Sequence, residues 1–315
     1  MRVVFFGTPG FAAPTLAALL ESSHPVIAVV TQPDRPRGRG QQVRPEAVKS
    51  LAEQRGLAVL QPARLRDEEF LKAFRSLEPD LAVVAAYGRI LPSELLKMPR
   101  LGFINVHGSV LPRWRGAAPV HRAILTGDRT TGVTIMQVVP ALDAGPMLAA
   151  AETEIGRDET SAELESRLAL LGATLLVSMI DRLAKGPVVA TPQDERLVTY
   201  ALKLERNESR IDWARPAEAV HNQIRGLQPW PLAAALLRGR RVSLLRSQVV
   251  SVSPGETEPG RIVSLDADGI VVGTDPGAVR ITSLQAEGRQ VLPAREFLRG
   301  ARINAGDRFD PLPVT

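Results

Sequence analysis

The sequence predicts an α/β protein in which a layered, largely parallel sheet is followed by a smaller β-barrel domain. Strand and helix signals alternate through the first half of the chain, which favours the layered sheet. A long amphipathic helix over residues 161–185 follows, and the last third carries brief strand-like runs separated by glycine and proline. The length of 315 residues, at roughly 150 residues per domain, agrees with two domains.

The first half alternates short apolar runs with helical patterns. Short β-branched runs at residues 2–6 and 26–31 predict strands, and residues 11–21 between them place leucines at helical spacing. A further helix is predicted after Asp67, which is a good N-cap. Residues 81–86 form a continuous apolar run, as expected for a central strand covered on both faces. Because strands and helices alternate along the chain, neighbouring strands are expected to be parallel.

The helix over residues 161–185 has the clearest boundaries. Thr160 and Glu163 match a capping box at its start, and a leucine-rich stripe, interpreted as core, follows one face. Beyond this helix the pattern has no sustained period until a short helix, predicted over residues 216–225, precedes the strand-like runs. The predicted organisation is a first domain of residues 1–188, a linker of residues 189–205 and a second domain of residues 206–315.

The composition excludes several kinds of chemistry. The chain has no cysteine, which rules out disulfides, thiol nucleophiles and thiolate metal sites. Its four histidines show no metal-ligand spacing, so no bound metal is expected. No run is long and apolar enough to cross a bilayer, and the first apolar run is too short for a signal peptide. The chain is therefore predicted to be cytoplasmic, with no membrane contact and no obligate protein partner.

The charge distribution separates two interpretations of an arginine excess. The net charge is +5, and 34 of the 39 basic residues are arginine. A general bias toward arginine explains this, and so does a polyanionic partner. Residues 206–246 hold eight basic and three acidic residues, a net of +5, and residues 31–49 hold five and two, a net of +3. Because a uniform bias does not cluster charge, these two segments favour a polyanion.

Asn105 and His107 form the most informative polar pair. If residues 103–107 end a strand, its alternation places both side chains on one face, and Gly108 releases the chain into a loop. Open α/β sheets build active sites at such strand ends. An asparagine amide can donate to a developing oxyanion, and histidine transfers protons near neutral pH. The alternative is a hydrogen-bonded core histidine beside a turn.

Two further features carry open alternatives. Asp143 lies in a predicted tight turn, where most aspartates bond only their own backbone, but a carboxylate that reached His107 would stabilise the charged imidazole. Trp114, between two arginines, either stacks on a flat ligand or covers apolar surface. Residues 7–10 lack the third glycine of a dinucleotide fingerprint and are interpreted mainly as a structural turn.

Several of these segments together resemble the bacterial methionyl-tRNA formyltransferases, a branch of the folate-dependent formyltransferases. The Asn-x-His and Leu-Pro-x-x-x-Gly elements mark the wider group, whereas the Gln-Pro-Asp-Arg-Pro loop and the second-domain motifs point to the tRNA branch. The resemblance extends from the first strand to about Val242 and thins after it. The segments that carry it are residues 5–9, 31–40, 86–88, 105–109, 111–119, 132–136, 210–213 and 229–231.

The resemblance implies a formyltransferase domain followed by a barrel similar to an OB fold. It implies transfer of the formyl group of 10-formyltetrahydrofolate to the α-amine of initiator methionyl-tRNA, for translation initiation. The family's catalytic positions fall on Asn105, His107 and Asp143. Its folate-contacting loop falls on Ser109, Val110, Leu111 and Pro112.

The resemblance also assigns the basic segments to tRNA. The loop around Arg37 and Arg39 matches a family insertion that approaches the end of the acceptor stem. Arginines of the second domain would contact phosphates and position the acceptor arm without reading sequence. The expected contacts in that domain are Arg206, Arg210, Arg238, Arg240 and Arg241.

Three other functions explain parts of the sequence. A formyltransferase that acts on an amino sugar nucleotide would share Asn105, His107 and Asp143, but it would not need a basic second domain. A nucleotide-binding oxidoreductase is poorly supported by the broken glycine fingerprint. A non-catalytic RNA-binding module explains the basic segments and leaves the Asn-x-His site unused.

Overall fold

The computed structural model describes residues 1–37, 42–43, 45–252 and 257–313. They form two compact units. The first comprises Met1–Pro119, Thr131–Thr153 and Glu165–Ala201, and the second comprises Val120–Thr130, Glu154–Leu164 and Leu202–Thr315. Residues 189–205, for which the sequence predicts a linker, are therefore divided between the units after Ala201.

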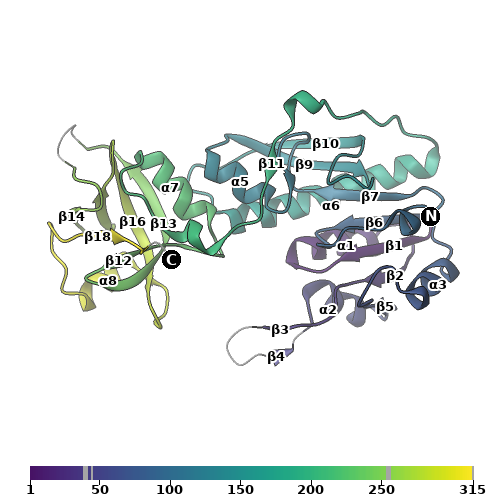
Figure 1. The fold of residues 1–315 in the computed structure, drawn as a ribbon, viewed down its shortest axis with the longest axis horizontal. Coiled ribbons are helices and arrows are strands. Elements are labelled where there is room, and N and C mark those ends of the chain that lie inside the picture. Colours follow the sequence, from purple (N-terminus) through teal and green to yellow (C-terminus); the bar gives the residue numbers. More distant parts are fainter. Residues whose placement is uncertain (38–41, 44, 253–256, 314–315) are drawn as a thin grey trace. The chain divides into compact units, whose positions relative to one another are not determined.

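The first unit is built on a seven-stranded sheet in the order β10-β9-β7-β6-β1-β2-β5 (Figure 1). Strands β5, β2, β1, β6 and β7 pair in parallel, and β7 and β9 pair antiparallel, so the predicted largely parallel sheet is confirmed. The strands are β1 (Val3–Gly7), β2 (Val26–Val30), β5 (Val59–Leu60), β6 (Leu81–Ala85), β7 (Phe103–His107), β9 (Thr130–Gln137) and β10 (Met147–Glu154).

The central strands of this sheet are apolar because helices and loops cover both faces. Every residue of β1 and β6 is buried, as the continuous apolar runs predict. On one face the Phe6 ring packs 5.4 Å from Tyr87 and 5.3 Å from Phe103, measured between ring centroids. The helices are α1 (Ala13–Leu20), α2 (Ala47–Gln54), α3 (Glu68–Ser76), α4 (Ser93–Leu96) and α6 (Ser161–Lys185), with the 3₁₀ turns η1 (Gly10–Ala12) and η2 (Glu195–Leu197).

The predicted start of α6 is confirmed in detail. The Thr160 backbone N–H donates to the Glu163 carboxylate at 2.9 Å, and the Glu163 N–H donates to the Thr160 hydroxyl at 3.4 Å. Asp67 precedes α3 as predicted, although its side chain accepts from the backbone N–H of Arg64 and not from the helix. Two short pairings complete the first unit, β3 (Pro36–Arg37) with β4 (Gln42–Val43) and β8 (Arg115–Gly116) with β11 (Tyr200–Ala201).

The second unit contains the predicted short strands, which pair antiparallel in the order β14-β15-β16-β13-β12-β18, with β17 paired to β16. Backbone hydrogen bonds also connect the two ends of this strand order. The Ile262 N–H donates to the Asp307 carbonyl at 2.7 Å, and the Phe309 N–H donates to the Gly260 carbonyl at 2.8 Å. The elements are β12 (Ala233–Leu237), β13 (Arg240–Val250), β14 (Ile262–Leu265), β15 (Ile270–Gly273), β16 (Ala278–Ala286), β17 (Leu292–Pro293), β18 (Phe309–Pro311), α5 (Pro119–Thr126), α7 (Ala217–Gly226), α8 (Ala294–Gly300) and the 3₁₀ turn η3 (Arg206–Ser209).

Within the described residues, no helix combines the length and the apolar character that crossing a membrane requires. The same part of the chain holds no group of three or more histidine, aspartate or glutamate side chains arranged to bind a metal ion.

Candidate active site

The predicted polar pair lies at the end of a strand in the middle of the sheet. Asn105 pairs with Val84 of β6 and with Met136 of β9, and His107, the last residue of β7, pairs with Thr134. Their spacing of two residues places both side chains on one face, with His107 buried and Asn105 half-buried. Within the described part of the chain the Asn105 amide has no hydrogen-bond partner, so it is available to a substrate.

The His107 ring is held by a backbone carbonyl that the sequence analysis did not predict. Its Nε2 lies 2.9 Å from the carbonyl oxygen of Trp114, and because a carbonyl only accepts, Nε2 carries the hydrogen. Nδ1 faces the Asp143 carboxylate, with 3.8 Å between Nδ1 and Oδ2. The structure thus brings His107 and Asp143 together, while the Trp114 carbonyl orients the ring. Nδ1 is the ring nitrogen left to exchange a proton with a substrate.

Asp143 does more than bond its own turn. Its Oδ2 accepts a hydrogen bond from the Gly116 N–H at 2.9 Å. Its backbone has a φ of 46°, in the left-handed region where aspartate is tolerated better than most residues. Gly145 closes the turn, since an added Cβ would lie 1.8 Å from the Gln137 carbonyl oxygen. The carboxylate is therefore held by a neighbouring loop and by a turn of unusual backbone geometry.

The loop that follows His107 is closed by its own hydrogen bonds. The Ser109 hydroxyl donates to the Arg113 carbonyl at 2.6 Å, and the Thr134 hydroxyl donates to the Ser109 carbonyl at 2.8 Å. Of the four residues expected to contact folate, Ser109 and Leu111 are buried, whereas Val110 and Pro112 are half-buried. The buried pair shapes the loop, and the half-buried pair is accessible to a ligand.

Trp114 and Arg115 are interior residues. Trp114 is 8% exposed, with the Arg113 guanidinium 4.5 Å above its ring, so it covers apolar interior and is not open for stacking on a ligand. Arg115 is 3% exposed, and its guanidinium pairs with the Glu195 carboxylate at 2.8 Å. Of the two roles that the sequence left open for Trp114, the structure supports coverage of the apolar interior.

Comparison with known proteins identifies the family. The family model for formyl transferase matches residues 1–180, and the model for the formyl transferase C-terminal domain matches residues 203–302. The methionyl-tRNA formyltransferase of Citrifermentans bemidjiense is 48% identical over 306 residues, which cover 97% of this chain and 95% of that protein. The chain belongs to the methionyl-tRNA formyltransferase family.

A second member of the family, the methionyl-tRNA formyltransferase of Paracoccus denitrificans, is 48% identical over 310 residues, 98% of this chain and 100% of that protein. The similarity to these relatives therefore extends over almost the whole chain and is not limited to the motif residues. The chain is an enzyme that transfers formyl groups, and the names of its relatives specify methionyl-tRNA as the acceptor.

Solved structures share the formyltransferase fold at low sequence identity. The N-formyltransferase from Helicobacter canadensis, solved with folinic acid and dTDP-3-aminofucose, has a TM-score of 0.70 at 17% identity and covers 91% of this chain and 99% of its own. HypX from Aquifex aeolicus, solved with tetrahydrofolic acid, has a TM-score of 0.64 at 20% identity and covers 95% of this chain and 47% of its own. Both likenesses extend the shared fold beyond the tRNA branch.

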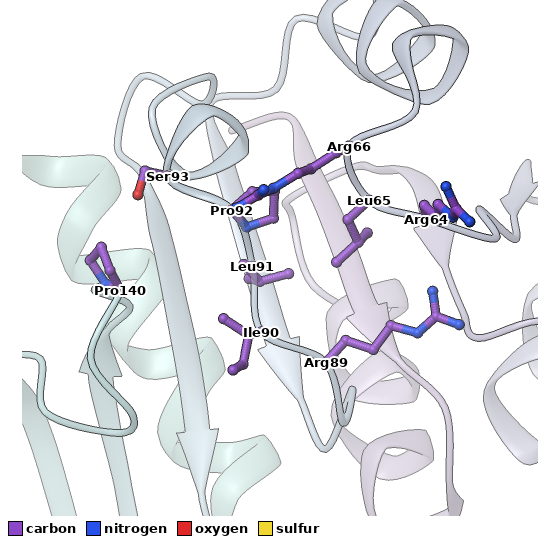
Figure 2. A pocket seen from close by; sticks show the side chains of 9 residues that line it. All are labelled: Arg64, Leu65, Arg66, Arg89, Ile90, Leu91, Pro92, Ser93 and Pro140. Atoms are coloured by element: carbon purple, nitrogen blue, oxygen red, sulfur yellow. The ribbon is translucent and has the colours of Figure 1, made fainter.

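A cavity of about 520 Å³ opens at the same edge of the sheet as the formyltransferase's polar pair. Its lining follows the carboxyl ends of β5 and β6, which are parallel to β7, and Pro140 lies in the same loop as Asp143. Figure 2 shows Arg64 and Arg89 on one side of the pocket and Pro140 on the other. The lining residues are Arg64, Leu65, Arg66, Arg89, Ile90, Leu91, Pro92, Ser93 and Pro140.

Sequence reasoning missed this cavity because its residues come from three separate loops. Arginine at positions 64, 66 and 89 adds positive charge to an apolar lining that includes Leu65 and Leu91. Arg89 is fixed in place, since it donates to the Pro62 and Ala63 carbonyls at 3.1 and 2.9 Å. The available signal was the position of these residues after buried strands, where parallel sheets bind ligands.

The arginines predicted to contact tRNA differ in their surroundings. Arg238 is paired with Asp307 at 2.8 Å, and Arg210 donates to the Leu312 carbonyl at 2.8 Å. Arg206 and Arg240 are exposed and Arg241 is half-buried, and within the described ranges none of these three is paired with an acid. Arg37 belongs to β3, and Arg39 lies outside the described residues.

Proposed function

We propose that this chain transfers the formyl group of 10-formyltetrahydrofolate to the α-amine of initiator methionyl-tRNA, with Asn105, His107 and Asp143 as the catalytic groups. The main observation behind the assignment of residues is the distance of 3.8 Å between His107 Nδ1 and Asp143 Oδ2. Asn105 lies at the end of the same strand as His107, and among the described residues its amide has no hydrogen-bond partner. A fixed donor and an acid–base pair are what acyl transfer to an amine requires.

The reaction exchanges one amide-type bond for another. The uncharged methionine amine attacks the formyl carbon, a tetrahedral oxyanion forms, and the bond from that carbon to the folate nitrogen breaks. The amine loses a proton and the leaving folate nitrogen gains one, so no net proton is released from these two groups. The chain has no cysteine, which agrees with direct transfer and no thioester intermediate.

Each catalytic group has one role in this proposal. The Asn105 amide donates a hydrogen bond to the oxyanion. It gives up no hydrogen bond to a described residue in doing so. The Trp114 carbonyl occupies Nε2 of His107, so Nδ1, together with the Asp143 carboxylate, receives the amine proton and returns it to the folate nitrogen. The Gly116 N–H holds one carboxylate oxygen in place during this exchange.

The folate donor is proposed to occupy the cavity beside the site. The apolar lining suits a flat ring system, and Arg64, Arg66 and Arg89 complement the carboxylates that folates carry. Val110 and Pro112 are the accessible residues of the folate loop. The solved relatives with tetrahydrofolic acid or folinic acid, which share the fold, support a folate donor.

The second unit is proposed to be an OB-like barrel that holds the tRNA. Hydrogen bonds between the two ends of the strand path support a closed barrel, and OB folds commonly bind nucleic acid. The acceptor arm would lie on the arginines at 206, 210, 238, 240 and 241, with the loop around Arg37 and Arg39 near the reactive end. Translation initiation places such an enzyme in the cytoplasm.

One assay tests the substrate assignment. The protein is incubated with 10-formyltetrahydrofolate and either charged initiator tRNA or a dTDP-amino sugar, and both acceptors are examined for a formyl group. Formylmethionyl-tRNA is the expected product. Formylation of the sugar nucleotide alone would overturn the proposal.

A further inference from the structure

The segment of residues 191–201 lies against the site, although its sequence suggests only a linker. Thr191 and Met147 exchange two backbone hydrogen bonds of 2.8 Å each at the start of β10. At the other end of the segment, β11 pairs in parallel with β8. Backbone pairing therefore holds both ends of the segment, one end next to the loop that carries Asp143 and the other next to the loop that carries Trp114. All of these residues belong to the first unit.

Gln193 is the residue of this segment that contacts the catalytic turn. Its Nε2 donates to the carbonyl oxygens of Asp143 and Gly145, each at 2.8 Å. Its Oε1 accepts from Arg115 Nε at 2.9 Å. Only this orientation of the amide satisfies all three partners, because two carbonyls need donors and a guanidinium needs an acceptor.

Arg115 fixes Gln193 from behind. Its side chain is 4% exposed, and its terminal nitrogens pair with the Glu195 carboxylate at 2.8 and 3.3 Å. A buried guanidinium held by a carboxylate has little freedom, so the amide that it contacts is also held. Hydrogen bonds thus run from Glu195 through Arg115 and Gln193 to the backbone of Asp143.

The Asp143 turn needs such support. With a φ of 46° its backbone is in a region that non-glycine residues occupy infrequently and at a cost in free energy. Gln193 holds the carbonyls on both sides of Ala144, and the Gly116 N–H holds the carboxylate. Removal of the two amide donors would release the backbone while leaving the bond from Gly116 to the carboxylate in place.

We propose that Gln193 is a positioning residue for formyl transfer, which holds the Asp143 turn so that the carboxylate faces His107 Nδ1. The proposal rests on the proposed catalytic role of Asp143. A displacement of about 1 Å at a catalytic group can cost on the order of 100-fold in rate. We therefore expect removal of the Gln193 donors to act on kcat more than on the KM of either substrate.

Gln193→Glu is the sharpest test, because it preserves the length of the side chain and an acceptor for Arg115 but removes both donors. We expect kcat for initiator methionyl-tRNA to fall about 10- to 100-fold, with each KM within about twofold of wild type. The matched control is Arg196→Ala, three residues later, whose 88%-exposed side chain pairs with Asp194. This control should retain wild-type kcat. An unchanged kcat in folded Gln193→Glu would overturn the proposal.

A double-mutant cycle distinguishes positioning from general destabilisation. Asp143→Asn is measured alone and with Gln193→Glu in single-turnover formylation. If Gln193 acts through Asp143, the second substitution costs less than about twofold in the Asp143→Asn background. An equal reduction in both backgrounds overturns the positioning role. Wild-type turnover of Asp143→Asn overturns the proposed catalytic role of Asp143, on which the Gln193 proposal rests, and the substrate assay described above tests the formyl transfer separately.

A second variant covers the case in which a half-buried carboxylate at position 193, facing two carbonyl oxygens, prevents folding. Gln193→Met removes both donors without adding charge, and its thermal unfolding and kcat are measured together. A folded Gln193→Met protein is expected to show the same reduction of kcat as Gln193→Glu. Wild-type kcat in that protein contradicts the proposal.

Discussion

The surroundings of His107 differ in kind from the arginine surface of the second unit, which is formed by Arg206, Arg240 and Arg241. His107 is 5% exposed and bonded to a backbone carbonyl, and the facing Asp143 is held through its side chain and its backbone. Arg206 and Arg240 are exposed, and within the described residues no acid pairs with them. One region is fixed in geometry, and the other presents unpaired charge to solvent.

The difference agrees with the two tasks of a methionyl-tRNA formyltransferase. Proton transfer and oxyanion stabilisation require donors placed in advance, because reorganisation at the moment of reaction costs rate. Contact with phosphates requires positive charge that can adapt, and its strength follows the salt concentration. Substitutions in the first region should therefore change kcat, and those in the second should change KM and its dependence on salt.

The largest effect is expected from Asn105→Ala and His107→Ala. Each removes a group proposed to act in the transition state, so turnover should fall about 10²- to 10³-fold while the Kd for tRNA stays within about twofold. Single-turnover formylation and filter binding measure the two quantities. His24→Ala is the matched control, because His24 is also buried in the first unit but bonds to Asp181, and it should retain turnover. Near-wild-type turnover of Asn105→Ala would remove its assigned role.

Glu165, a half-buried carboxyl group outside the site, sharpens the comparison. Its protonation should change the free energy of unfolding and leave kcat unchanged. Burial raises the pKa of Glu165 on α6 from its ordinary 4.5 to about 7. Between these two values the folded state binds more protons than the unfolded chain, so the free energy of unfolding falls as the pH rises through this window. Above pH 7 the destabilisation is complete, and below pH 4.5 it is absent.

Glu165→Gln should accordingly stabilise the protein at pH 8, by at most about 3 kcal/mol, and leave it nearly unchanged at pH 4. Urea unfolding at the two values measures the difference. Glu69→Gln, an exposed position on α3, is the control and should show the same small change at both. Equal stabilisation at pH 4 and pH 8 in Glu165→Gln would contradict the assignment to proton linkage.

The arginine surface is tested by Arg240→Ala combined with Arg241→Ala. We expect the KM for methionyl-tRNA to rise about tenfold, kcat to stay unchanged, and the slope of log affinity against log salt to decrease by about 1 for each phosphate that the variant no longer neutralises. Arg295→Ala combined with Arg299→Ala on α8 removes the same charge from two exposed positions elsewhere in the second unit. If both pairs weaken binding equally, net charge and not a defined surface is responsible.

The smallest effect is expected from Arg39→Ala. The resemblance places this arginine near the end of the acceptor stem, so its removal should reduce the preference for initiator over elongator methionyl-tRNA several-fold with little change in kcat. The ratio of kcat/KM for the two tRNAs measures this preference. Lys72→Ala on α3, which removes an exposed cation paired with Glu68, should leave the ratio unchanged.

Local patterns predicted much of the fold. The apolar runs of β1 and β6 and the capping box of α6 are signals contained in a few consecutive residues, and the structure confirms them. The spacing of Asn105 and His107 is of the same kind, since strand alternation decides the shared face. Resemblance to the family added Asp143, whose approach to His107 no local pattern indicates.

The rest of the site depends on contacts between distant residues. Gln193 lies 50 residues from Asp143 in the chain, in a segment without periodicity, and no composition rule distinguishes it from a surface glutamine. The Trp114 carbonyl and the Gly116 N–H are backbone groups, which the sequence does not identify as functional. The cavity is likewise formed by three loops that meet only when parallel strands align.

The sequence alone therefore determined two domains, the alternating sheet, the polar strand end, the absence of thiol chemistry and the clustering of arginine. Only the tertiary structure decided that Trp114 orients His107 and that a segment expected to be a linker holds Asp143. Periodicity encodes which face of an element is buried, because burial is repeated along neighbouring residues. The geometry around His107 depends on single hydrogen bonds between residues far apart in the sequence. Such bonds produce no periodic pattern in the sequence.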